Sequence, residues 1–218
     1  MTFPFRTISY AATGCAAVAS ALAYPFLPER VATHFDADGR PDRESSRRSA
    51  ALQLPALMAA LAVLNDLLAA WPGSRDREDR DSGVRARDQA IALTELALLP
   101  SHLSLLARGV GMRVDPPRIT RAVNAALIVA LGNLLPRLPR NGLVGIRTPW
   151  TLADPTVWER THRVGGYLVS AAGLVSLLSL PASGRRASRL SSAAILTAVG
   201  LSAAYSYVAF RRRDRETG

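Results

Sequence analysis

Lysine is absent from this sequence of 218 residues, and Cys15 is its single cysteine. One cysteine excludes an intrachain disulfide and the cysteine-rich metal motifs. All 27 basic residues are arginine, which we attribute to the codon usage of a GC-rich bacterial genome. Despite a formal net charge of +10, the arginines stand between apolar runs and form no RNA-binding signature or zinc-finger spacing. The sequence therefore predicts no direct nucleic-acid partner.

Long apolar runs dominate what the sequence does contain. Hydrophobic residues make up 49% and charged residues 20% of the chain, and the charges crowd into short segments between those runs. A helix of about 20 apolar residues spans the ~30 Å hydrocarbon core of a bilayer. We predict one all-α polytopic integral membrane domain over residues 1–218. Short polar loops would join six transmembrane helices at residues 8–27, 49–71, 90–107, 120–136, 164–182 and 190–210.

Two of these runs need separate comment. The run at 90–107 is the weakest, because Glu95 and His102 interrupt it, so a five-span version stays open. The first run imitates a secretory signal peptide, with Arg6 before a short apolar region. Because five further apolar runs follow, we interpret it as an uncleaved span.

The distribution of arginine indicates an orientation. If both termini share a side with the connections that follow the second and fourth predicted spans, that side holds 15 arginines and the other side holds 12. Cytoplasmic loops carry the excess of basic residues. We therefore expect a multi-pass protein of the bacterial plasma membrane with both termini in the cytoplasm.

The loop at 28–48 gathers potential metal ligands at His34, Asp36, Asp38 and Asp42. Gly39 and Pro41 indicate a turn among them. An EF-hand needs oxygen ligands at alternate positions before its glycine, whereas here Gly39 follows Asp38 directly and an arginine comes next. We predict no metal site here, and a solvated turn instead.

In the loop at 137–163, the dipeptide Asn141-Gly142 predicts a turn. Asp154 followed by proline predicts the N-cap and first residue of a short helix. Trp158 and His162 would share one face of that helix, since they are four residues apart. One interpretation of Arg147 is that it binds a carboxylate or a lipid phosphate. The alternative is a structural role, in which it caps backbone carbonyls or extends toward the lipid headgroups. No nucleophile elbow, phosphate loop or metalloprotease spacing is present, so we predict no catalytic residue, no cofactor and no enzymatic activity.

Polar residues inside the predicted spans are costly in lipid and usually face the bundle interior. Glu95 and His102, seven residues apart on one helix face, are the ionisable pair of the third span. Hydrogen bonding between helices is the favoured interpretation, and a proton or ion path is the alternative. Further polar residues are Asn65, Asp66, Asn124 and Asn133.

The loop at 137–163, the second of the two polar loops described above, resembles the signature of the SdpI immunity-protein family of bacterial membrane proteins. The motif "GN…P…PRNGLVGIRTPWTL…VW…THR..G" covers Gly132, Asn133, Asn141, Gly145, Ile146, Arg147, Thr148, Pro149, Trp150, Thr151, Leu152, Trp158, Thr161, His162 and Gly165. The first loop, "LPERVATHFDADGRPD", resembles a domain of unknown function found at the amino-terminal end of such proteins. The resemblance divides the chain into a first helix pair at 8–71 and an SdpI-like region at 120–210.

This resemblance implies a six-span protein that protects a cell against a secreted antimicrobial toxin peptide. It also implies signalling, because the family's namesake sequesters a transcriptional repressor at the membrane when toxin is bound. Membrane lipid, a toxin peptide and a cytoplasmic repressor are thus the expected partners. We expect the signature residues to form a cytoplasmic element for partner binding, and His34, Asp36, Gly39 and Pro41 to contribute to extracellular recognition. A small ion-coupled transporter using Glu95 and His102 is the alternative, and a membrane enzyme built on the second loop is a weaker one.

Overall fold

The computed structural model describes residues 5–36, 38–70, 77–141, 144–182 and 184–217. These residues are mostly helical, as the sequence predicted. The α-helices are α1 (Phe5–Ala23), α2 (Arg47–Ala70), α3 (Arg77–Gly109), α4 (Pro116–Leu134), α5 (Pro149–Ala153), α6 (Pro155–Leu178) and α7 (Gly184–Thr217). Short 3-10 turns are η1 (Tyr24–Phe26) and η2 (Leu135–Arg137), and the strands are β1 (Arg30–Phe35) and β2 (Pro41–Ser46).

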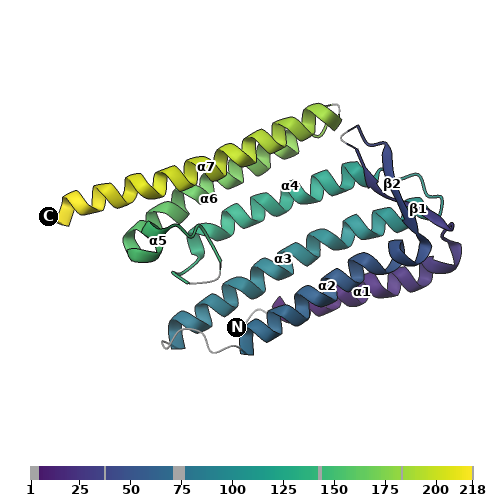
Figure 1. Cartoon of the computed structure of the whole chain (residues 1–218), viewed down its shortest axis with the longest axis horizontal. Coiled ribbons are helices and arrows are strands. Elements are labelled where there is room, and N and C mark those ends of the chain that lie inside the picture. Colours follow the sequence, from purple (N-terminus) through teal and green to yellow (C-terminus); the bar gives the residue numbers. More distant parts are fainter. Residues whose placement is uncertain (1–4, 37, 71–76, 142–143, 183, 218) are drawn as a thin grey trace.

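The long helices run side by side along one axis (Figure 1). The pair α1 and α2 packs on one side of α3, and α4 packs on the other side together with α6 and α7. Large apolar side chains face outward: Leu22, Leu178 and Leu196 are 70%, 81% and 71% exposed. Polar side chains such as Glu95 and His102 are fully buried. Such an inverted pattern is typical of a helix bundle whose surroundings are lipid.

Five helices are long and apolar enough to cross a bilayer: Phe5–Phe26, Arg47–Ala69, Gly83–Gly109, Pro116–Arg137 and Gly184–Arg215. The all-α polytopic prediction is thereby confirmed. The doubtful third run is one of the five and begins earlier than predicted. α6 is not among them, because Glu159, Arg160 and Arg163 occupy its first turns and leave a shorter apolar part. The count of six spans is therefore confirmed only in part. The end of the second predicted span, at residue 71, lies outside the described residues.

Small residues let α4 and α6 approach each other closely. A Cβ added to Gly132 would lie 2.5 Å from the backbone nitrogen of Ser170, and one added to Gly166 would lie 2.7 Å from the carbonyl oxygen of Gly132. Helix association in lipid depends on such contacts, since no hydrophobic effect operates between apolar helices there. These contacts hold α6 in the bundle.

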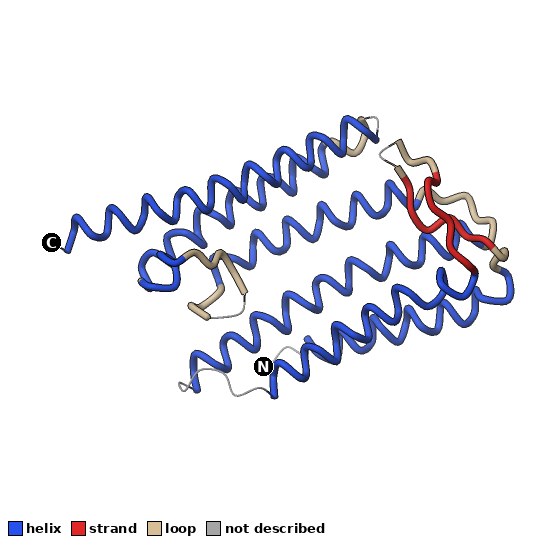
Figure 2. The backbone as a smooth tube through the Cα atoms, in the orientation of Figure 1, coloured by secondary structure: helices blue, strands red, loops and turns tan. Residues whose placement is uncertain are grey.

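The first polar loop folds as a β-hairpin, which the sequence did not indicate. β1 and β2 pair antiparallel from Arg30 opposite Ser46 to Phe35 opposite Pro41. Gly39 turns the chain with a φ of 81°, so the predicted turn is confirmed. The hairpin lies across one end of the bundle, while α5 and both chain ends lie at the other (Figure 2). The two termini therefore share an end with the second loop, as the predicted topology requires.

Candidate functional site

The second polar loop, called here the signature loop (residues 137–163), contains α5. A capping box, in which Thr148 and Thr151 hydrogen-bond each other's backbone, starts this helix. Thr148 Oγ1 accepts a hydrogen bond from the Thr151 N–H at 3.3 Å, and Thr151 Oγ1 accepts one from the Thr148 N–H at 2.9 Å. Thr151 Oγ1 also donates to the Ile146 carbonyl at 2.7 Å. Pro149 starts the helix, where a missing N–H costs nothing. The run Thr148 to Thr151 is thus the residue pattern that starts α5.

Trp158 and His162 form the buried centre of the signature loop. The indole N–H of Trp158 donates to the Leu138 carbonyl at 2.9 Å, and its ring stacks on His162 with centroids 3.9 Å apart. The Ile146 N–H donates to Nε2 of His162 at 3.0 Å, so Nε2 carries no proton and Nδ1 donates to the Trp158 carbonyl at 2.9 Å. Gly145 fits against this ring: a Cβ there would lie 2.3 Å from His162 Nε2. These contacts hold His162 as a neutral structural residue.

The signature loop also binds the far end of α7. Thr148 Oγ1 donates to Ser206 Oγ at 3.1 Å, and Trp150 packs edge-on against Tyr207 with ring centroids 5.1 Å apart. Sequence reasoning did not connect Trp150 with Tyr207. These contacts couple the position of the loop to that of the last helix.

Asp154 is the N-cap of α6, as its position before proline predicted, but the predicted short helix is wrong, because α6 continues from Pro155 to Leu178 without a break. Its Oδ1 accepts hydrogen bonds from the N–H groups of Thr156 at 2.7 Å and Val157 at 3.0 Å. Chiefly through the Val157 hydrogen bond, with the Arg213 guanidinium 3.6 Å away, the pKa of Asp154 is held below its usual value. The carboxylate thus fixes the direction in which α6 leaves the loop.

The remaining signature residues divide into buried and exposed ones. Asn141 accepts from the Val144 N–H at 2.8 Å and donates to the Pro139 carbonyl at 2.9 Å, which makes it a turn residue as predicted. Thr161 is buried, while Asn133 and Pro149 are exposed. The rest of that turn, Gly142 and Leu143, lies outside the described residues.

Arg147 is the signature residue best placed to meet a partner. Its side chain is exposed, and within the described ranges no hydrogen bond or ion pair joins it to another residue. Its neighbours Ile146 and Thr148 are held by His162 and Thr151. The loop therefore presents the guanidinium on a fixed backbone, which suits a carboxylate or a phosphate.

At the opposite end, the acidic residues of the hairpin have partners of their own. His34 Nδ1 lies 2.6 Å from Asp42 Oδ1, and Asp38 lies 2.8 Å from Arg185 of α7. Asp36 Oδ1 accepts from two backbone N–H groups of its own turn, at 2.8 and 2.9 Å, and the nearer, that of Arg40, does most to lower the pKa of Asp36. Over the described ranges no three His, Cys, Asp or Glu side chains group as metal ligands.

Three polar pairs join α1 to α3 at equal spacing. Arg6 contacts Asp88 at 2.8 Å, the Thr13 hydroxyl donates to Glu95 at 3.4 Å, and Ser20 Oγ lies 2.7 Å from His102 Nε2. Both helices advance by seven residues per pair, as two parallel helices in heptad register do, with about 10 Å between pairs. Glu95 Oε1 and His102 Nδ1 find no hydrogen-bond partner in the described chain. The predicted pair thus lies on one face of α3 against α1, and transport through it stays a prediction.

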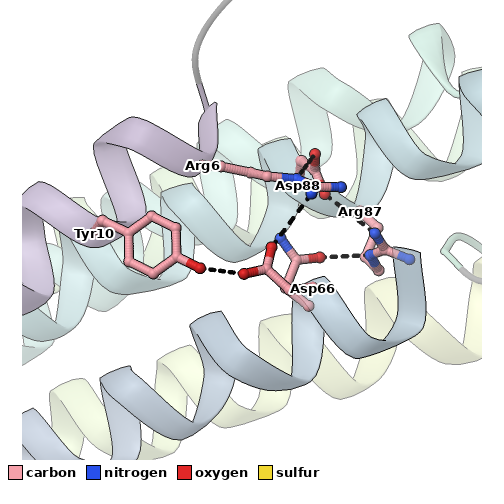
Figure 3. A network of polar contacts seen from close by, with 6 residues as sticks. Arg6, Tyr10, Asp66, Arg87 and Asp88 are labelled. Atoms are coloured by element: carbon pink, nitrogen blue, oxygen red, sulfur yellow. Dashed lines mark hydrogen bonds and ion pairs between the residues drawn. The ribbon is translucent and has the colours of Figure 1, made fainter. Parts of the chain in front are cut away.

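The first of these pairs belongs to a larger network (Figure 3). Its members are Arg6, Tyr10, Asn65, Asp66, Arg87 and Asp88. Arg87 is buried and lies 3.2 Å from Asp88, and its Nε donates to the amide oxygen of Asn65. Sequence reasoning missed Arg87 and Asp88, because the charged segment before residue 90 was taken for a connector. The sequence did contain a signal for Asp88, because Asp88 lies seven residues before Glu95, as Glu95 lies seven residues before His102.

Comparison with known proteins supports the resemblance inferred from the motif. Residues 137–209 match the SdpI/YfhL protein family, and residues 11–59 match a domain of unknown function (DUF1648). A curated relative, the immunity protein SdpI of Bacillus subtilis (strain 168), is 31% identical over 74 residues. That match covers 34% of this chain and 36% of the relative, so it spans about a third of the relative's length. No solved structure matches the chain.

Proposed function

We propose that this chain is an immunity or signal-transducing membrane protein, which protects a bacterial cell from a secreted toxin peptide. Similarity to the SdpI/YfhL family over the signature loop and to an immunity protein supports the proposal. The matched family is not one of known enzymes, and we propose no catalytic activity. Arg147 is the observation that carries the signalling part, because it is exposed on a fixed loop.

The molecule offers one surface at each end for such a role. Val31 of the hairpin and Leu27 just before it share a hydrophobic cluster with Leu105 of α3. Trp158 of the signature loop shares another with Ala86 of α3. α3 thus contributes to the core at both ends. We propose that the hairpin meets the toxin outside the cell, and that Arg147 meets an acidic surface of a cytoplasmic repressor. Tilting of α3 would connect the two events.

Protection is measured by expressing the chain in toxin-sensitive bacteria together with a peptide encoded beside its gene. We expect growth to be restored. Arg147→Ala should leave protection intact while abolishing membrane recruitment of a repressor encoded alongside, because recruitment needs the exposed guanidinium. Arg211→Ala, an exposed arginine at the same end of the bundle, is the matched control. No protection against any such peptide would contradict the immunity role, and equal recruitment by Arg147→Ala would contradict the signalling role.

The orientation is measured with reporter fusions that end after Arg43 and after Thr151. A phosphatase that is active only outside the cytoplasm should be active at the first position and inactive at the second. A fluorescent protein that folds only in the cytoplasm serves as the complementary reporter. Equal readouts at the two positions would contradict the proposed placement of the hairpin and the signature loop on opposite sides.

A further inference from the structure

A cavity of about 510 Å³ lies beneath the hairpin. β1 and the turn after it form its roof through Phe35 and Asp36, and its walls come from α2, α3, α4 and the start of α7. None of its lining residues belongs to the signature loop, although Phe35 and Asp36 belong to the motif of the first loop. Its volume is in the range of ordinary ligand sites.

The lining of the cavity has a polar part that includes Arg121 of α4. The Arg121 Nε is buried, and it finds no hydrogen-bond partner in the part of the chain that the structure describes. Asp36, a carboxylate of the same cavity, already accepts hydrogen bonds from its own turn. Hydroxyl groups of Thr120 and Ser188 and the amide of Asn124 lie around the cavity as well. A buried guanidinium nitrogen without an acceptor is costly, so this wall fits an anionic group with further hydrogen-bonding atoms.

The lining of the cavity also has an apolar part. Leu54, Leu98 and Leu105 line it from α2 and α3. α3 packs against both α2 and α4 (Figure 1), so these leucines lie between neighbouring helices of the bundle. Thr120, Arg121 and Ser188 lie within about one and a half turns of the starts of α4 and α7, which is the depth of lipid headgroups when the helices cross a bilayer. Leu98 lies about three turns from the end of α3, which is the depth of acyl chains.

We propose that this cavity is a phospholipid site. The Arg121 guanidinium binds the phosphodiester, the hydroxyl and amide groups bind the glycerol and headgroup oxygens, and an acyl chain lies over the leucines of the lining. The charge of this end agrees, since its loops and helix starts at 27–48, 108–121 and 185–189 hold 12 arginines and six carboxylates. An acyl chain matches the leucine lining of the cavity, whereas a small anion such as inorganic phosphate would leave those leucines uncovered.

Native mass spectrometry of the purified full chain tests the site with defined probes. Phosphatidylglycerol should bind with a stoichiometry of one at low lipid concentration, whereas diacylglycerol, which lacks the phosphate, and inorganic phosphate, which lacks the chains, should not. Arg121→Gln should weaken phosphatidylglycerol binding about tenfold, because it removes a charge-assisted hydrogen bond. Arg118→Gln is the matched control. Arg118 is exposed one turn earlier on the same helix, and its replacement removes the same charge.

A second variant keeps the test independent of any folding defect. Ser188→Phe enters the cavity from α7 and leaves Arg121 unchanged, so it should displace the lipid with little change in the melting temperature of lipid-free protein. Equal weakening by Arg118→Gln and Arg121→Gln would overturn the proposal, because binding would then follow net charge. Binding of inorganic phosphate alone, or of diacylglycerol as well as phosphatidylglycerol, would also overturn it.

Discussion

Replacing Gly145 by alanine is expected to lower the free energy of unfolding by about 3 kcal/mol, from backbone strain plus a lost buried hydrogen bond. Gly145 has a φ of 124°, a conformation that L residues rarely adopt. The added Cβ would also lie 2.3 Å from His162 Nε2. His162 cannot turn away cheaply, because its other ring nitrogen bonds the Trp158 carbonyl. The Ile146 hydrogen bond to His162 should therefore break.

Two glycines provide matched controls for this prediction. Gly111 has a φ of 91° and open space around its Cβ position, so Gly111→Ala measures backbone strain without a clash. Gly14 is helical with equally open space, and alanine there should be neutral or slightly stabilising. The expected order of destabilisation is Gly145, then Gly111, then Gly14, measured by denaturant unfolding in mixed micelles. Removing the ring with His162→Ala should make the added Gly145→Ala change less costly, and full additivity of the two would contradict the clash.

The membrane class was predictable because run length is a direct consequence of bilayer thickness. The termini lie at one end of the bundle, as the alternation of runs required. α6 is the instructive exception. Its charged first turns shorten the apolar run, so its membership of the bundle depends on the glycines that face α4, and packing of that kind has no signature in hydropathy.

The hairpin could not be predicted for a related reason. β2 is largely exposed and reads as a polar loop, since Pro41, Asp42, Arg43 and Glu44 lack an alternating apolar face. Its pairing comes from Gly39 and from packing of Val31 on the helices. Likewise, the motif identified Trp158 and His162 but not their roles. Which residues are buried and which face outward, as Arg147 does, depends on tertiary contacts that are remote in sequence.

The buried ion cluster carries the second large expected effect. Asp88→Ala is expected to lower the free energy of unfolding by about 3 kcal/mol, because removing one partner of a buried ion pair leaves an uncompensated charge. Arg87 is 4% exposed, and Asp88 and Asn65 are its hydrogen-bonding partners among the described residues. Arg6 loses the same carboxylate but is 40% exposed in its side chain, so it can reorient toward water. The cost should therefore come mainly from Arg87.

Arg85→Ala is the control, since Arg85 is exposed on the same helix two residues before Arg87, and its loss should change stability by less than about 0.5 kcal/mol. The double variant Arg87→Ala/Asp88→Ala should lose less than the sum of the single variants, because neither charge is then left alone. The same unfolding assay in mixed micelles gives all four values. Additive losses, or an Asp88→Ala variant as stable as Arg85→Ala, would mean that water reaches the cluster and that α1, α2 and α3 are held together by their small residues instead.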